Sequence, residues 1–176
     1  VLAPAPGIAV ETPKLNAGTQ ALFDRALSLM QAQQYAAAEV LFAEITEDQP
    51  ELAGPWVNLG FIHAHNGDEV AAEQAFEKAL EANPYNCDAR NQLGVRARRA
   101  GRFADAETHY LACIEAQPNY ANAHLNLAIL YELYMGRLGE ALAAYNEYQL
   151  VLPEPDTKVG GWMMDLERRV AAVAKR

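Results

Sequence analysis

Histidine and cysteine are the residues of this chain whose side chains could bind a metal ion or act as nucleophiles. Two of the four histidines, His63 and His65, are two residues apart, and residues with that spacing do not share a face of a helix. Cys113 is typical of a small core residue, and the spacing of Cys87 and Cys113 neither requires a disulfide nor excludes one. The sequence contains no zinc-ligand spacing, no G-x-S-x-G motif and no phosphate-binding glycine loop. We therefore expect a chain without enzyme activity, cofactor or metal ion.

Charged side chains form two further patterns. Glu69, Glu73 and Glu77 follow one another at intervals of four residues, which is typical of a solvated helix face rather than of a catalytic carboxylate pair. Five of the ten arginines fall within 13 residues of an otherwise acidic chain: Arg90, Arg96, Arg98, Arg99 and Arg102. These arginines are either ordinary surface charge or a basic patch for the carboxylates or phosphate of a partner.

The elements that must position these side chains follow from a pattern with a period of 34 residues. The second copy contains Leu59, Gly60, Gly67, Ala72, Glu73, Phe76, Ala79 and Pro84, and the third contains Leu93, Gly94, Gly101, Ala106, Glu107, Tyr110, Cys113 and Pro118. The first copy contains Leu22, Ala26, Leu29, Ala38, Glu39, Phe42, Ile45 and Pro50. The fourth contains Leu127, Ala128 and Tyr131, gains one residue around Met135 and Gly136, and continues with Ala141, Tyr145, Tyr148 and Pro153.

Each copy predicts two amphipathic helices of about 12 to 14 residues that pack antiparallel. Glycine ends the first helix at Gly67 and Gly101, whereas Gln33 takes this place in the first copy. A glycine inside a helix, such as Gly60, costs about 1 kcal/mol relative to alanine. An interior Gly60 suggests that something packs too closely to tolerate a side chain. We infer that Gly60, Gly94, Ala72 and Ala106 let the backbones approach where two helices cross, and that the rings of Phe76 and Tyr110 fill the space beside them.

A 34-residue period with this order of small, aromatic and proline positions resembles the tetratricopeptide repeat. The resemblance covers Thr19 to about Pro155 and implies an all-α fold, a right-handed α-solenoid of about four helix-turn-helix units. The units are expected over residues 19–52, 53–86, 87–120 and 121–155.

The two ends of the chain lie outside these repeats. Residues 1–18 contain three prolines and predict an extended N-terminal tether. Residues 157–175 predict a capping helix that covers the last apolar face, because stacked repeats otherwise leave that face exposed. The apolar face of this helix is expected to consist of Trp162, Leu166, Val170 and Val173.

The resemblance also implies where a partner binds, because the first helices of such repeats line a concave groove. In the first two copies the corresponding residues are Phe23, Leu27, Met30 and Gln31, then Val57, Phe61, Ala64 and His65. In the last two they are Asp88, Asn91, Val95, Arg98 and Arg99, then Asn122, Leu125, Ile129, Glu132 and Leu133. Apolar floors with a few polar groups suit an extended peptide or an amphipathic helix. The carboxylate clamp of repeat proteins that bind heat-shock chaperones is not expected, because only Asn58 matches its residue types.

Composition and charge narrow the classes of partner. The chain is 51% hydrophobic and carries a formal net charge of −9, which disfavours binding to nucleic acid or anionic lipid. No apolar run approaches the length of about 20 residues that a membrane span needs. We therefore expect a scaffold or adaptor for protein–protein interaction, and self-association through the apolar N-terminal segment. The alternatives are a secretion chaperone or envelope or pilus assembly factor, and a regulatory subunit of an enzyme complex.

The first residues bear on the compartment. The chain begins at Val1, and an Ala-Pro tether before a folded domain suits an exported protein or a lipoprotein trimmed of its anchor. A chain shortened by cloning explains the same beginning. The expectation is the bacterial periplasm or the outer membrane, with the cytoplasm as the alternative.

Overall fold

A computed structural model describes residues 16–173 of the chain, with side chains described as far as Ala172. Throughout this range the regular secondary structure is helical. The expected tether, apart from its last three residues, and the last two residues of the expected capping helix lie outside the described range. The chain divides into two compact units, Val1–Ala89 and Arg90–Arg176, and the division falls inside one helix.

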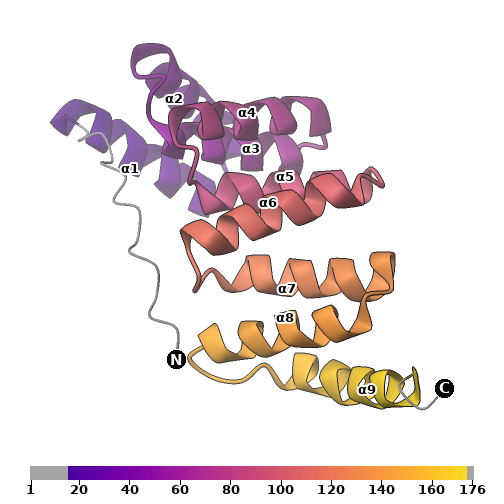
Figure 1. The fold of residues 1–176 in the computed structure, drawn as a ribbon. Helices are drawn as coiled ribbons and strands as arrows, with labels where there is room; N and C mark the ends of the chain where they lie inside the picture. The colour runs from indigo at the N-terminus through magenta and orange to yellow at the C-terminus, as the bar shows by residue number, and fades with distance from the viewer. Residues whose placement is uncertain (1–15, 174–176) are drawn as a thin grey trace. The chain divides into compact units, whose positions relative to one another are not determined.

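The first unit contains two antiparallel helix pairs and the start of a fifth helix (Figure 1). The helices are α1 (Ala17–Gln31), α2 (Tyr35–Asp48), α3 (Ala53–His65), α4 (Glu69–Ala82) and the first residues of α5 (Cys87–Arg99). α1 packs against α2, α3 packs against α4, and α2 contacts α3, so that the two pairs are stacked. The core of this unit is built around Phe42, Ile45 and Ile62, which are at most 2% exposed.

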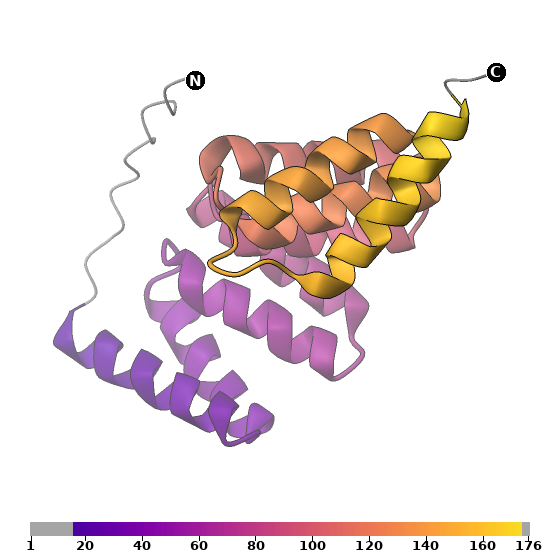
Figure 2. The same ribbon diagram turned by 90° about the horizontal axis from the view of Figure 1, so that it is seen from below.

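The second unit contains the rest of α5 and α6, one further helix pair, and a terminal helix. These helices are α6 (Phe103–Ala116), α7 (Ala121–Ile129), the π-helix η1 (Leu130–Met135), α8 (Leu138–Val151) and α9 (Thr157–Val173). α7 pairs with α8, and α9 lies beside α8 (Figure 2). Tyr110, Tyr145 and Leu130 are the largest fully buried side chains of its core.

Helix α1 begins at Ala17, so the prediction that residues 17 and 18 belong to an extended tether is wrong. The Asn16 side chain accepts a hydrogen bond of 2.9 Å from the backbone N–H of Thr19, which caps the helix two residues before the expected boundary. The prolines that favour an extended chain all precede Asn16. The repeat pattern predicted too late a start for this helix, because the capping residue Asn16 lies outside the repeat.

The first helices of the repeats end as the turn glycines predict. Gly67, Gly101 and Gly136 have φ angles of 81°, 75° and 66°, a left-handed conformation that glycine adopts without steric cost. In the first repeat Gln33 adopts the same conformation, with φ 59°. A residue with a side chain therefore occupies a position that favours glycine.

The close packing of glycine against an aromatic ring is confirmed. A Cβ atom placed on Gly60 would lie 2.6 Å from Cε1 of Phe76, closer than real Cβ contacts allow. In the second unit the ring of Tyr110 leaves no room for a side chain at Gly94 in the same way. Phe76 and Tyr110 are both 0% exposed. Because glycine has no side chain, there is room for these two rings in the core.

The extra residue of the fourth repeat is accommodated in η1. This π-helix continues α7 from Leu130 to Met135, and the chain then turns at Gly136. A π-helical turn holds one residue more than an α-helical turn, so the downstream helix keeps its register. Tyr145 in α8 is consequently buried, at 1% exposed, like Tyr110 in α6.

Helix α9 covers the end of the second unit. It runs through the pair Gly160 and Gly161, so these glycines do not break it. Val159 and Leu166 are at most 1% exposed and Val170 packs against the core, whereas Trp162 remains 39% exposed. The buried face is therefore rotated from the predicted one, and Trp162 lies at its border with solvent.

Candidate protein-binding surface

In the first unit, the residues predicted to line a groove are mostly half-buried and pack among aromatic rings. Phe23 meets the ring of Phe42 edge-on with 5.5 Å between centroids, and Phe61 contacts Phe76 in the same way at 5.5 Å. His65 is exposed and its ring lies 4.1 Å from that of Tyr35. Leu27 and Met30 are half-buried, whereas Val57 is buried at 5% exposed.

In the second unit, the predicted groove residues differ in exposure. Val95, Leu125 and Ile129 are half-buried against the core, and the exposed residues are Arg99, Asn122 and Leu133. Asn91 is only 4% exposed, and its side-chain oxygen accepts a hydrogen bond of 2.9 Å from Nδ2 of Asn126. Asn91 therefore links α5 to α7 and presents almost no surface to a ligand.

A hollow of about 440 Å³ opens on this face of the second unit, between the end of α7, η1 and α9. Its apolar lining comes from Ile129, Leu133, Trp162 and the ring of Tyr145. Leu133 is 66% exposed, although it is an apolar residue. Of the lining residues, Ile129, Glu132 and Leu133 were predicted as groove residues. Trp162 was not, since its placement depends on how α9 packs.

Two carboxylates, Glu132 and Asp165, line the polar side of the hollow. Glu132 accepts a hydrogen bond of 3.0 Å from the hydroxyl of Tyr145 and forms an ion pair of 2.5 Å with Nη1 of Arg169. Burial first, and then the hydrogen bond to Glu132, raise the pKa of Tyr145 above its usual range. Asp165 pairs with Arg168 at 3.1 Å and lies 4.0 Å from Nη1 of Arg169, so both carboxylates of the hollow are matched by arginine inside the chain.

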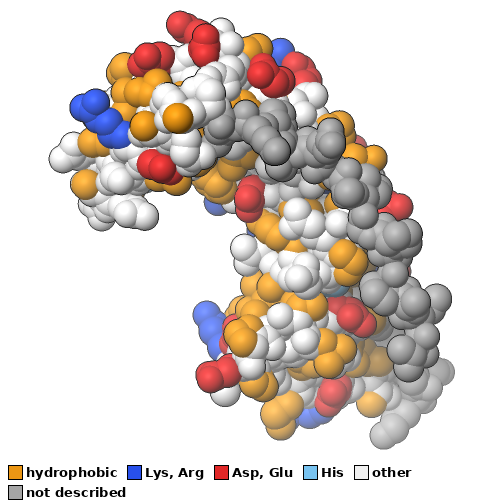
Figure 3. Space-filling model, turned by 90° about the vertical axis from the view of Figure 1, so that its left-hand side faces the viewer, with side chains coloured by type: hydrophobic (Ala, Val, Ile, Leu, Met, Phe, Trp, Pro, Cys, Tyr) orange, Lys and Arg blue, Asp and Glu red, His pale blue; other side chains and the backbone are white. Residues whose placement is uncertain are grey.

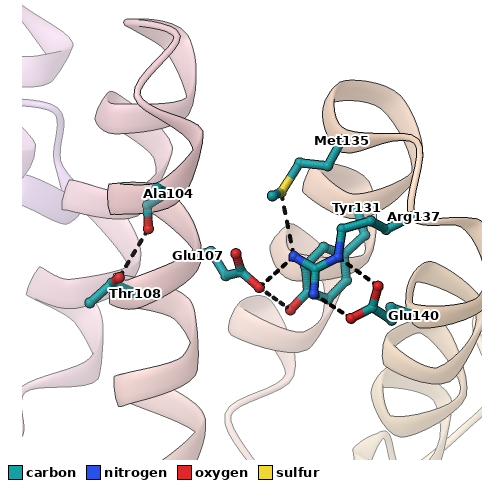
Figure 4. A network of polar contacts seen from close by, with 7 residues as sticks. All are labelled: Ala104, Glu107, Thr108, Tyr131, Met135, Arg137 and Glu140. Atoms are coloured by element: carbon teal, nitrogen blue, oxygen red, sulfur yellow. Dashed lines mark hydrogen bonds and ion pairs between the residues drawn. The ribbon is translucent and has the colours of Figure 1, made fainter.

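A second polar network fixes the fourth repeat to the third and lies away from the hollow (Figure 4). Glu107 accepts hydrogen bonds of 2.7 Å from both the hydroxyl of Tyr131 and Nη1 of Arg137. Arg137 also pairs with Glu140, lowering the pKa of that carboxyl, and its guanidinium carbon lies 4.2 Å from the centre of the Tyr131 ring. Burial, and then the bond to Glu107, raise the pKa of Tyr131 to about 12. This satisfied network is structural.

The clustered arginines do not share one environment. Arg96 is 7% exposed, and its Nη1 donates to the backbone and side-chain oxygens of Gln92 at 3.2 Å. Arg98 is half-buried and its guanidinium carbon lies 5.6 Å from the ring centre of Tyr134, whereas Arg99 is exposed. On the face drawn in Figure 3, acidic side chains are interspersed with hydrophobic ones. Because Arg96 is buried, a basic patch at this place consists of Arg98 and Arg99 and does not include Arg96.

The residues that could bind metal are dispersed. In residues 16–172 no three histidine, cysteine, aspartate or glutamate side chains gather as a metal site. Both cysteines are disulfide-bonded, and Cys87 and Cys113 are at most 2% exposed. None of the helices described has the length and apolar composition to cross a membrane.

Known proteins resemble this chain over most of its length. A family model described as tetratricopeptide repeat matches residues 23–86 and 91–154. Tetratricopeptide repeat protein 8 of Mus musculus is 29% identical over 110 residues, which are 62% of this chain and 21% of the mouse protein. The probable UDP-N-acetylglucosamine–peptide N-acetylglucosaminyltransferase SPINDLY of Hordeum vulgare is 27% identical over 147 residues, 80% of this chain and 16% of that protein. The chain thus spans about a fifth or less of these two relatives.

Solved structures share the fold at lower identity. A structure of MamA of Desulfovibrio magneticus RS-1, from residue 41 to the end, superposes with a TM-score of 0.72 at 18% identity, covering 90% of this chain and 88% of the solved chain. PilF of Pseudomonas aeruginosa gives 0.75 at 18% identity, with 88% and 69% covered. YrrB, described as a tetratricopeptide repeat protein with an unusual peptide-binding site, gives 0.64 at 19% identity, with 85% and 74% covered. With its helix pairs, its glycine and aromatic packing and the match to the family model, the chain belongs to the tetratricopeptide repeat family.

Proposed function

We propose that this chain is a non-enzymatic scaffold that binds a peptide or helix of another protein along the first helices of its repeats. Tetratricopeptide repeats are in general non-catalytic scaffolds for protein–protein interaction. The particular peptide is not encoded in the fold, because one repeat architecture serves many partners. Its binding site has to be argued from the surface of this chain.

One observation carries the proposal, the apolar hollow of the second unit. Its volume of about 440 Å³ is that of a site for one or two large side chains. Leu133 and Trp162, at 66% and 39% exposed, present apolar surface at this hollow, and contiguous apolar surface marks interaction sites. An apolar side chain of a bound peptide or helix would shield both residues from water.

The test is a selection from a random peptide library displayed on phage, with the purified chain as target. We expect enriched peptides to bind the parent and to lose roughly tenfold or more in affinity with Leu133→Asp, because a charge replaces an apolar contact. Leu150→Asp is the matched control, since Leu150 is also an exposed leucine, at 76%, and it lies on α8 and does not line the hollow. Fluorescence anisotropy gives the affinities. Peptides that bind the Leu133→Asp variant as tightly as the parent would contradict the proposed site.

A role as the regulatory subunit of an enzyme complex is the first alternative. The relative SPINDLY is named as a probable transferase, and this chain is similar to only 16% of it. A repeat segment of this kind can therefore accompany a catalytic part carried elsewhere. Recovery of the same enzyme in every cross-linked complex from the native cell would favour this alternative.

A role as a secretion chaperone or as an envelope or pilus assembly factor is the second alternative, with a location in the periplasm or at the outer membrane. The disulfide-bonded state of Cys87 and Cys113 supports it, because disulfides persist in oxidising compartments and are rare in the cytosol. Both cysteines are buried, so the test quenches native cells with acid, unfolds the protein, and labels its thiols before and after reduction. Labelling that needs no prior reduction would favour the cytoplasm instead.

The remaining partners are also proposals. The net charge of −9 supports the expectation that nucleic acid is not a ligand, and a filter-binding assay at low salt checks it. Self-association through residues 1–15 is tested by sedimentation of the full chain against a chain without them. Equal sedimentation coefficients, corrected for mass, at high concentration would count against self-association.

A further inference from the structure

Two tyrosines at equivalent positions of the second unit differ in how their hydroxyl groups are satisfied. Tyr110 in α6 and Tyr145 in α8 are 0% and 1% exposed, and each packs its ring against the first helix of its own repeat. The Tyr145 hydroxyl donates to Glu132, as described above. The Tyr110 hydroxyl is buried and has no hydrogen-bond partner among the described residues.

The difference follows from one position of the repeat. The residue 34 positions before Glu132 is Arg98, so an arginine takes the place of the carboxylate that satisfies Tyr145. Arginine has only donors and accepts no hydrogen bond. Nε of Arg98 is itself buried without a partner in the described part of the chain. Nε of Arg98 and the Tyr110 hydroxyl are therefore both buried donors without an acceptor in this part of the chain.

The packing of α5 places the two groups close together, because the Tyr110 ring lies against Gly94 and Arg98 follows four residues later on the same face of α5. Burial raises the pKa of Tyr110 to about 12, and the positive charge of Arg98 acts on the same hydroxyl in the opposite direction. Tyr134 is near as well, because its own hydroxyl contributes to the raised pKa of Tyr110 and its ring contacts the Arg98 guanidinium. An anion near the pair would gain the charge of Arg98 and two hydrogen bonds.

We propose that Arg98 and Tyr110 form an acceptor-binding site for the carboxylate of an aspartate or glutamate side chain in the bound protein segment. One carboxylate oxygen accepts from Nε of Arg98 and the other from the hydroxyl of Tyr110, a two-point contact that a neutral amide cannot match in charge. The inference rests on the proposed function and specifies its ligand: the segment that fills the hollow carries an acidic residue.

Entry to the site requires a side-chain movement. The two donor atoms are shielded from solvent, and Tyr134 lies against the Arg98 guanidinium. Tyr134 is 47% exposed and belongs to η1, and its ring centre lies 5.3 Å from that of Phe103. Rotation of the Tyr134 ring into solvent would give up its contacts with Phe103 and Arg98 and would open a path to the two donors.

The first test compares each selected peptide that contains Asp or Glu with the same peptide carrying Asn or Gln. We expect the parent chain to prefer the acidic form by about tenfold or more, as charged hydrogen bonds do. Arg98→Glu should abolish the preference and keep the fold, because the new carboxylate can accept from Tyr110 as Glu132 does from Tyr145. Tyr110→Phe should reduce the preference without changing the net charge. Arg99→Glu is the charge-matched control and should keep most of the preference.

The second test uses defined small probes and needs no selected peptide. The Arg98 Nε–H resonance is followed by NMR during titration with N-acetyl-glutamate amide and, separately, with N-acetyl-glutamine amide. We expect a saturable shift with the first probe only, absent in Tyr110→Phe at the same concentration. No shift with the acidic probe overturns the inference, whatever the peptide selection gives.

The outcomes separate this inference from the proposed function. Peptides that depend on Leu133 but bind equally in acidic and amide forms would overturn the carboxylate site and leave the scaffold. Peptides whose affinity does not change with Leu133→Asp would overturn the proposed binding surface. The NMR titration would then decide by itself whether Arg98 and Tyr110 bind a carboxylate.

Discussion

Replacing Gly60 by alanine tests the packing on which the repeat depends. A Cβ atom there would lie 2.6, 2.7 and 2.8 Å from three atoms of the Phe76 ring, which is 0% exposed and cannot move into solvent. Overpacking of this kind costs about 1–3 kcal/mol, while alanine gains about 1 kcal/mol over glycine from helix propensity. The net change in the free energy of unfolding is therefore a loss of between about zero and 2 kcal/mol.

Gly161 provides the matched control. It lies inside α9, and no described atom lies within 4 Å of a Cβ placed on it, so Gly161→Ala should keep the full gain of about 1 kcal/mol. Urea unfolding followed by circular dichroism measures both variants. In a Phe76→Leu background the loss at Gly60 should shrink, since the clashing ring is gone. Equal stabilisation by Gly60→Ala and Gly161→Ala would refute the reasoning.

Two further predictions concern the helix ends. Gln33→Gly should increase the free energy of unfolding by about 1 kcal/mol and raise the thermal midpoint, because Gln33 holds a left-handed φ of 59°. Ala32→Gly is the control and should lower the thermal midpoint, because Ala32 has an ordinary φ of −78°. A lower midpoint in both variants would exclude strain at Gln33. Asp156→Ala should destabilise the second unit at pH 7, because the carboxylate accepts from the N–H of Val159 and from the Tyr148 hydroxyl. These bonds lower the pKa of Asp156 below its usual 3.8, so its contribution is present above pH 3.8 and is lost as pH falls through the lowered pKa. Thermal midpoints from pH 7 to pH 2 should therefore converge for the parent and the Asp156→Ala variant, and a constant difference would speak against this account.

The sequence by itself determined the helix pairs and the contacts inside each repeat. Gly60 with Phe76 and Gly94 with Tyr110 recur at a fixed offset within one helix pair, so a single period predicts both. The turn glycines are equally local, since each sets the backbone of its own residue. The extra residue of the fourth repeat was also visible, although its accommodation as a π-helix was not.

The position of individual groove residues was only partly determined. The repeat register assigned Val57 and Asn91 to the groove, and the structure buries both side chains. A register fixes the direction in which a side chain leaves its helix, but its exposure depends on how closely the neighbouring helix packs. The role of these residues in binding remains a prediction.

Only the tertiary structure decided the hollow and the unpaired donors. The hollow exists because α9 places Trp162 near Ile129 and Leu133, more than 25 residues earlier in the chain. The ion pair of Arg169 with Glu132 likewise joins residues that no repeat relates. The sequence places Arg98 at the repeat position of Glu132, but only the packed structure shows that Nε of Arg98 and the Tyr110 hydroxyl are buried without an acceptor among the described residues. A periodic sequence specifies contacts that repeat with its period. The docking of a non-repeated helix, and the sharing of hydrogen bonds among neighbouring side chains, depend on distances that arise only when the chain is packed.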